Sequence, residues 1–302
     1  MNKKTLKGIV LLFITAFVWG VAFVAQSVGM EHLNAFAFNS IRNLIGAVVL
    51  LPVILFRQKT LANSQTDKTI TSIKNNPKDC ILGGLLCGIM LCIASNFQQM
   101  GIEHSTVGKA AFITTLYIVL VPILGIFLKR KLSLKTWIGV ILAMFGLYML
   151  CMKDEAFVLG TEDIYLLLCA LFFSFQILLV EYYVQKVDGV ILSVLQFLVC
   201  GILSGIGMLF TEIPTITDIT SAGIPLLYAG VISCGVGYTL QIIGQRDVPS
   251  TVASLIMSLE SVIAALAGWI LLHEVLSPKE LFGCALVFIA VILTQLPSKK
   301  KN

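Results

Sequence analysis

Three charged residues lie inside long apolar segments, where a charge is costly and usually has a partner or a function. They are Arg42, Lys109 and Glu260. The guanidinium of Arg42 could bind an anionic group of a solute or pair with Glu260. Glu260 could carry a coupling proton, contact a solute or make a structural hydrogen bond. Lys109 could bind a solute or extend its ammonium group to the nearby surface.

Uncharged polar side chains recur at helical spacing in several of the same apolar segments. At about 100° per residue, Ser254 and Ser258 share one face of a predicted helix, about 180° from Glu260. In lipid such groups must face protein or a wet cavity, and the serines could equally serve close helix packing. Together with the three charged residues, the candidates for lining a solute site are Trp19, Asn96, Gln98, Tyr117, Tyr238, Gln241, Ser254 and Ser258.

No pattern typical of catalysis or metal binding accompanies these residues. The eight cysteines form no C-x-x-C pair, and the three histidines do not complete a ligand set with them. The sequence also lacks H-E-x-x-H, G-x-S-x-G and a glycine-rich nucleotide loop. We therefore expect no metal, no cofactor and no enzymatic activity.

The composition requires that membrane-spanning helices position the candidate residues. Hydrophobic residues make up 58% of the 302-residue chain and charged residues 12%, against about 25% in a soluble domain. Such a chain cannot cover a surface that faces water, whereas about 20 apolar residues suffice to cross a bilayer. The sequence predicts ten spans, at 8–28, 34–56, 80–102, 106–128, 134–152, 163–183, 189–210, 220–243, 250–271 and 279–296.

The distribution of Lys and Arg between the loops predicts the orientation. With ten spans, 17 of the 21 basic residues fall on one side, Arg42 lies within a span, and Lys109, Lys153 and Lys279 fall on the other side. By the positive-inside rule both termini are cytoplasmic, in a multi-pass protein of the cell membrane. The net charge of +5 therefore reflects loop location and not nucleic-acid binding. The polar segment 57–79 is expected to be a mobile cytoplasmic loop.

The second half of the chain repeats features of the first. Polar residues and glycines match in order: Ser105-Thr106-Val107 with Ser250-Thr251-Val252, Leu132-Ser133 with Leu276-Ser277, Gly139 with Gly283, and Gln98 with Gln241. This predicts two five-helix halves, residues 1–156 and 157–302. Because five is odd, the second half must be inserted upside down. Inverted repeats are typical of secondary transporters, with the solute site near the midplane between the halves.

The whole chain resembles the EamA family of the drug/metabolite transporter superfamily. The resemblance rests on Trp19-Gly20, Arg42, LYIVLVP with Pro122, and SLESVIAALAGWILLHEVLS from Ser258. It implies ten helices as two inverted repeats, and a central cavity lined by helices 1–4 and 6–9, with helices 5 and 10 peripheral. Members move amino acids, nucleotide-like metabolites and other small solutes, often outward. The chain departs from the family pattern at Arg130, Ser261 and His273.

These features predict a secondary transporter that exports a small polar metabolite by alternating access. The alternatives are a membrane channel or a lipid scramblase, and less readily a membrane-embedded enzyme. The expected partners are a small-molecule solute and the lipid bilayer. Coupling to protons and assembly as a homodimer are left open by the sequence.

Overall fold

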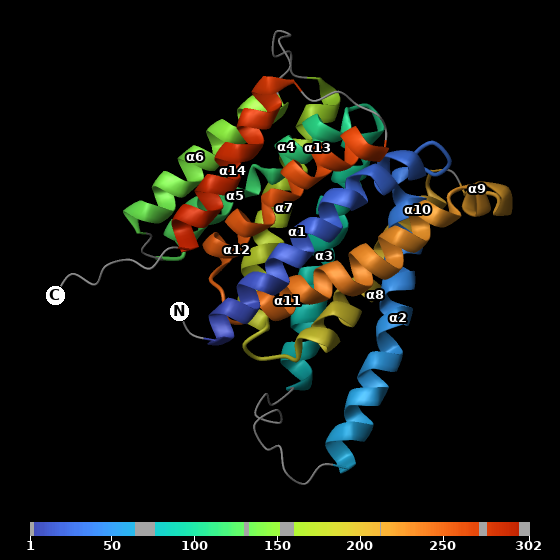
Figure 1. Cartoon of the computed structure of the whole chain (residues 1–302). Coiled ribbons are helices and arrows are strands. Elements are labelled where there is room, and N and C mark those ends of the chain that lie inside the picture. The colour runs from blue at the N-terminus through green and yellow to red at the C-terminus, as the bar shows by residue number, and fades with distance from the viewer. Residues whose placement is uncertain are drawn as a thin grey trace.

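The computed structural model describes residues 3–63, 76–129, 133–151, 160–211, 213–271 and 277–295, which form helices and their connections without a strand (Figure 1). The first half contains α1 (Lys3–Gly29), α2 (Ala35–Asn63), α3 (Pro77–Glu103), α4 (Val107–Thr115), α5 (Tyr117–Phe127) and α6 (Leu134–Cys151). The second half contains α7 (Thr161–Tyr183), α8 (Gly189–Leu209), α9 (Ile216–Ser221), α10 (Gly223–Leu227), η1 (Tyr228–Tyr238), α11 (Thr239–Gln245), α12 (Ser250–Met257), α13 (Leu259–Leu271) and α14 (Pro278–Gln295).

Apart from the six-residue helix α9, these elements make ten helical rods within the described ranges, because α4 continues into α5, α10 into η1 and α11, and α12 into α13. Eight of the rods are long and apolar enough to cross a bilayer. The other two are α6, whose apolar part spans Leu134–Met149, and α14, which packs along it. Large hydrophobic side chains are exposed on most of these rods, among them Phe127 at 79% and Ile224 at 84%, as expected of a surface that lipid covers. The predicted all-α, ten-helix membrane fold is confirmed.

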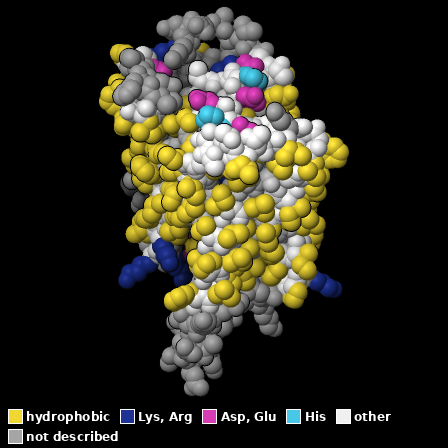
Figure 2. All heavy atoms as spheres, turned by 90° about the vertical axis from the view of Figure 1, so that its right-hand side faces the viewer, with side chains coloured by type: hydrophobic (Ala, Val, Ile, Leu, Met, Phe, Trp, Pro, Cys, Tyr) yellow, Lys and Arg dark blue, Asp and Glu magenta, His cyan; other side chains and the backbone are white. Residues whose placement is uncertain are grey.

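The two ends of the bundle carry opposite charge. Figure 2 shows hydrophobic side chains over the middle, acidic side chains and histidines with a few basic side chains at one end, and basic side chains at the other. We name the first the acidic end, after Glu31, Glu103, Glu162, Asp163 and Asp218. We name the second the basic end, after Lys3, Lys4, Lys7, Lys186 and Arg246.

The predicted loop at 57–79 is shorter than expected. Helix α2 continues to Asn63, and α3 begins at Pro77, which stands at the first helical position where its missing N–H costs nothing. The Asn76 side chain caps α3 by accepting a hydrogen bond from the Lys78 N–H at 3.2 Å. Residues 64–75, where mobility was predicted, lie outside the described residues, as do Arg130 and His273.

Two predicted spans, 106–128 and 250–271, are each interrupted once. The break at Leu116 separates α4 from α5, and the break at Ser258 separates α12 from α13. At both breaks a side-chain hydroxyl donates a hydrogen bond to a backbone carbonyl of the preceding turn, and such bonds often bend helices. Thr115 donates to Ala111 O at 2.6 Å, and Ser258 donates to Leu255 O at 2.7 Å. Neither break ends the membrane crossing.

The predicted span 220–243 is the least regular rod. Its centre, η1, is a π-helix of 11 residues with the sequence YAGVISCGVGY. Glycines let it lie against its neighbours: a Cβ at Gly230 would lie 2.6 Å from Ile45 on α2, and one at Gly237 would lie 2.7 Å from Trp19 Nε1 on α1. A π-helix closes i→i+5 hydrogen bonds, so it presents residues at a wider spacing than an α-helix.

Corresponding helices of the two halves run antiparallel where they meet. On the second helices, Ser40 of α2 donates to Gly201 O of α8 at 3.0 Å, and a Cβ at Gly207 would lie 2.5 Å from Phe36. On the fifth helices, a Cβ at Gly139 of α6 would lie 2.3 Å from Thr294 of α14. A Cβ at Gly146, two turns on, would lie 2.9 Å from the Gly283 carbonyl oxygen.

The Trp19-Gly20 pair brings α1 into contact with α13. A Cβ at Gly20 would lie 2.5 Å from Ile263 Cβ and 2.8 Å from the Glu260 carbonyl oxygen, so a side chain there would have to move a helix backbone. Gly108 of α4 has nothing within 4 Å of the same position, which makes it a matched control.

Gly20→Ala is therefore expected to destabilise the protein by about 1–3 kcal/mol through overpacking. Gly108→Ala, in the first turn of an exposed helix end, should leave stability unchanged or slightly higher. The apparent melting temperatures of the two variants in detergent would test this. Equal melting temperatures would show that α1 and α13 separate without cost.

Candidate functional site

A pocket lies in the middle of the bundle. It is lined by Trp19, Ala22, Phe23, Gln26, Arg42, Gln98, Thr114, Tyr117, Phe173, Gln176, Ile177, Ser233, Tyr238, Gln241 and Glu260. These residues come from α1 to α5, α7, η1, α11 and α13, so both halves contribute. As the family resemblance implied, α6 and α14 supply none of them. Helix α8, implied as a lining helix, supplies none either and stands one layer behind.

Arg42 is the basic group of the pocket and is only 2% exposed. Its Nη1 donates to Gln26 Oε1 at 2.7 Å, and its guanidinium carbon lies 5.6 Å from the centre of the Phe38 ring. Its Nε is buried and makes no hydrogen bond to any described residue. The cation is thus held by neutral groups and keeps donor capacity for another acceptor.

Glu260 is the acidic group of the pocket and is 3% exposed. Its Oε1 accepts a hydrogen bond from the Tyr117 hydroxyl at 2.8 Å. Among the described residues no ion pair within 4.0 Å joins it to Arg42. A basic and an acidic side chain therefore face one buried space, and each is hydrogen-bonded to a neutral partner. Unpaired buried charges are costly, so the pocket favours a polar occupant.

Aromatic rings form one wall of the pocket. The ring centres of Trp19 and Tyr238 lie 4.5 Å apart, and the two ring planes are tilted by 55°. The ring of Phe197 on α8 packs edge-on against Tyr238, with 5.8 Å between the ring centres. Trp19 Nε1 is buried and has no hydrogen-bond partner among the described residues. This wall could contact the apolar part of a solute, while the indole N–H offers a donor.

Amides form another wall. Gln241 Nε2 donates to Gln176 Oε1 at 3.3 Å, and Gln176 Nε2 donates to Gln196 Oε1 at 3.3 Å, which joins α11, α7 and α8. The remaining Gln241 oxygen and the Gln196 nitrogen make no hydrogen bond within the described part of the chain. Gln241 thus presents an acceptor in the pocket while its donor is fixed by a neighbour.

Of the residues predicted to contact a solute, the structure brings seven to this pocket. They are Trp19, Arg42, Gln98, Tyr117, Tyr238, Gln241 and the coupling candidate Glu260. Their role in binding stays a prediction. Ser254 and Ser258, which were predicted to line the solute site, are not among the lining residues, and Glu260 lies about 180° from them around the helix.

Three of the other candidates make their hydrogen bonds outside the pocket. Asn96 Nδ2 donates to Ser204 Oγ at 2.9 Å and so joins α3 to α8. Ser254 donates to Thr251 O at 3.0 Å, and Ser258 to Leu255 O, within their own rod. The structure places these three residues outside the pocket, and their predicted contact with a solute stays a prediction.

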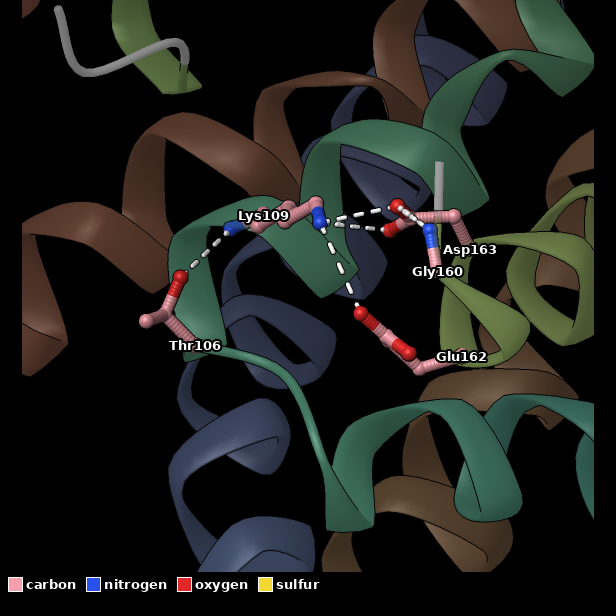
Figure 3. Close-up of polar contacts among 5 residues, drawn as sticks. All are labelled: Thr106, Lys109, Gly160, Glu162 and Asp163. Atoms are coloured by element: carbon pink, nitrogen blue, oxygen red, sulfur yellow. Dashed lines mark hydrogen bonds and ion pairs between the residues drawn. The ribbon is translucent and has the colours of Figure 1, made fainter. Parts of the chain in front are cut away.

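Lys109 also lies outside the pocket, at the acidic end (Figure 3). Its Nζ is 2.8 Å from each carboxylate oxygen of Asp163 and 3.9 Å from Glu162 Oε1. Its side chain is 27% exposed, so it does extend toward the surface, but it ends on an ion pair. The predicted contact of Lys109 with a solute stays a prediction.

The most informative lining residues that sequence reasoning missed are Gln26, Gln176 and Ser233. The signal for both glutamines was present, since each is an amide inside an apolar segment, as Gln98 is. Ser233 could not be found in this way. At α-helical spacing Cys234 shares a face with Tyr238, but in the π-helix η1 the residue five positions before Tyr238 reaches the pocket.

Comparison with known proteins supports the same fold and a transport role. The EamA-like transporter family model matches residues 6–152 and 160–296. An uncharacterized transporter of Archaeoglobus fulgidus is 30% identical, over 94% of this chain and 84% of its own. The uncharacterized inner membrane transporter YedA of Escherichia coli is 22% identical over 94% and 89%. The uncharacterized transporter YoaV of Bacillus subtilis is 20% identical over 99% of both chains.

A solved crystal structure superimposes over 96% of both chains with a TM-score of 0.76. At 15% sequence identity this likeness concerns the fold alone. The family match covers both halves separately, and the relatives span almost the full length. The chain belongs to the EamA-like transporter family, and it is a multi-pass membrane transporter.

Proposed function

We propose that this transporter moves a small zwitterionic metabolite of the amino-acid class by alternating access of two inverted halves. The main support for this proposal is that Arg42 and Glu260 face one buried pocket and are each hydrogen-bonded to a neutral partner. A solute with a carboxylate and an ammonium group would compensate both charges at once. The aromatic wall of Trp19 and Tyr238 would contact its side chain.

A nucleotide-like solute fits the pocket less well. Phosphate groups are usually held by several Arg or Lys side chains or by a helix N-terminus. Arg42 is the basic residue among the described lining residues, and the other polar groups there are amides, hydroxyls and an indole. The charges thus balance for a zwitterion and not for a polyanion.

The antiparallel contacts of α2 with α8 and of α6 with α14 support the inverted arrangement, since corresponding helices of inverted repeats cross the membrane in opposite directions. The positive-inside rule would place the basic end in the cytoplasm and the acidic end outside the cell membrane. Outward transport is carried over from the family resemblance and rests on no feature of the pocket.

Exchange in proteoliposomes tests this function. Vesicles preloaded with an unlabelled neutral amino acid are expected to take up the labelled one with saturable kinetics, above protein-free vesicles and above the corresponding amine without a carboxylate. The reason is that only the zwitterion meets both Arg42 and Glu260. Equal, unsaturable passage of unrelated solutes would instead indicate a channel, and lipid exchange between leaflets without solute uptake would indicate a scramblase.

A further inference from the structure

Two helix N-termini from different halves meet at the acidic end, and they carry opposite charges (Figure 3). Lys109 is the third residue of α4, whose start is capped by the Thr106 hydroxyl, which accepts from the Lys109 N–H at 3.3 Å. Asp163 is the third residue of α7, and its Oδ2 accepts from the Gly160 N–H at 3.0 Å. The side chains of Lys109 and Asp163 join the two starts.

Local helix preference explains Asp163 but not Lys109. A carboxylate at the third position of a helix satisfies a free N–H and interacts well with the positive end of the helix dipole. A cation at that position is unfavourable for the same reason. Lys109 is therefore placed by its tertiary contact, in which the fully buried Asp163 carboxylate lies 2.8 Å from its Nζ.

The two helices that this ion pair joins also line the pocket. From Lys109, the first-half rod continues to Thr114 and Tyr117, about 8 and 12 Å further along at 1.5 Å per residue. From Asp163, α7 continues to Phe173 and Gln176, about 15 and 20 Å further along. The ion pair thus ties the halves together on the acidic side of the pocket.

The basic end has a contact of the same kind that is weaker. There Lys186, after α7, lies 3.9 Å from Asp79 at the start of α3, again between the halves. Both side chains are about a third exposed, at 38% and 31%. Exposed pairs at this distance hold weakly, whereas breaking a pair with a buried partner leaves an uncompensated charge. Of these two ion pairs between the halves, the one at the acidic end is therefore the stronger.

We propose that the Lys109–Asp163 ion pair is the gate of the acidic end. It closes that side of the pocket when formed, and it must break for the pocket to open there. This rests on the proposed alternating access, and it gives Lys109 a role in the transport cycle without contact to the solute.

Accessibility of the pocket tests the gate without knowledge of the solute. Ser233→Cys places a thiol in the pocket, and a membrane-impermeant methanethiosulfonate is applied to intact cells and to inside-out vesicles. Adding Lys109→Ala is expected to speed modification from the acidic side by roughly tenfold, because a minor open state of 0.1–10% leaves room for that shift. Lys109→Arg should keep the slow rate.

The matched controls separate the gate from a general effect of charge. Lys279→Ala removes a lysine at the start of the peripheral α14, and it should leave the rate unchanged. The charge swap Lys109→Asp with Asp163→Lys should restore slow modification. An unchanged rate in Lys109→Ala from the acidic side would overturn the gate. A thiol that reacts from neither side in any variant would overturn alternating access itself.

A second measurement covers the case in which Lys109→Ala does not accumulate. In the pair Lys109→Cys and Asp163→Cys, a bifunctional methanethiosulfonate whose linker replaces the length of the lysine side chain should join the two helix starts. Exchange in proteoliposomes is then expected to stop on crosslinking and to recover when the disulfides are reduced, while each single variant treated in the same way is unaffected. Continued exchange after complete crosslinking would show that the two helix starts stay together throughout transport.

Discussion

Replacing Arg42 with Gln is expected to lower transport of a carboxylate-bearing solute by roughly 30- to 1000-fold. A buried charged partner is worth about 2–4 kcal/mol when it is truncated, and this converts to that range. The loss should concentrate on the carboxylate, since the Arg42 Nε is the group without a protein partner among the described residues. Rates for each amino acid and its matching amine, measured by exchange in proteoliposomes, would separate the two contributions.

Two control variants define what this result means. Arg42→Lys keeps the positive charge but not the fork of donors, so it should retain part of the activity. Arg246→Gln removes an exposed cation at the basic end and should change little. An equal loss for amino acid and amine, or a loss of protein from the membrane, would mean that Arg42 serves the fold through Gln26 and Phe38.

Residues that face the pocket could be predicted where their type and their position in one apolar helix are sufficient evidence. Arg42 and Glu260 are identified by the cost of a charge in an apolar segment, and the structure places both at the pocket. Trp19 and Gln98 follow from polar or aromatic character in the same way. Knowledge of the neighbouring helices is not needed, because polar groups within a bilayer must face protein or a wet cavity.

Residues whose partners lie on other helices could not be predicted. Asn96 satisfies the same criteria as Gln98, but Ser204 of α8 binds it, and Ser204 is 108 positions away in the sequence. From the sequence, Lys109 could be a lysine that extends its ammonium group to the surface. The structure shows instead that Asp163, at the start of α7, lies beside it. In both cases a contact between the two halves determines where the side chain lies, and that contact depends on how the halves pack.

The π-helix η1 could not be predicted for a different reason. Its sequence contains three glycines and no proline, and nothing in its periodicity distinguishes it from an α-helix. The wider turn comes from close packing, with Gly230 against α2 and Gly237 against Trp19. Only with that packing does Ser233 share the pocket with Tyr238. The pocket composition was therefore predictable in its charges and only partly in its hydroxyls and amides.

Replacing Glu260 with Gln is expected to remove the pH dependence of transport. A carboxamide keeps the size of the side chain and can still accept the hydrogen bond from Tyr117, so the fold should persist. It cannot bind and release a proton, and it cannot compensate an ammonium group. Solute accumulation driven by a pH gradient should therefore fall to the level of protein-free vesicles, while exchange at equal pH continues at a reduced rate.

The proton and the ammonium roles of Glu260 predict different residual activities. If Glu260 carries the coupling proton, a solute without an ammonium group is exchanged equally well by the variant and the parent protein. If Glu260 binds the ammonium group, the variant loses its preference for amino acids over the matching carboxylic acids. Glu181→Gln is the matched control, because Glu181 lies in the last turn of α7 at the basic end, where the Ser250 hydroxyl donates to it. An unchanged pH profile in Glu260→Gln would remove Glu260 as the proton carrier, and unchanged selectivity as well would leave it a purely structural partner of Tyr117.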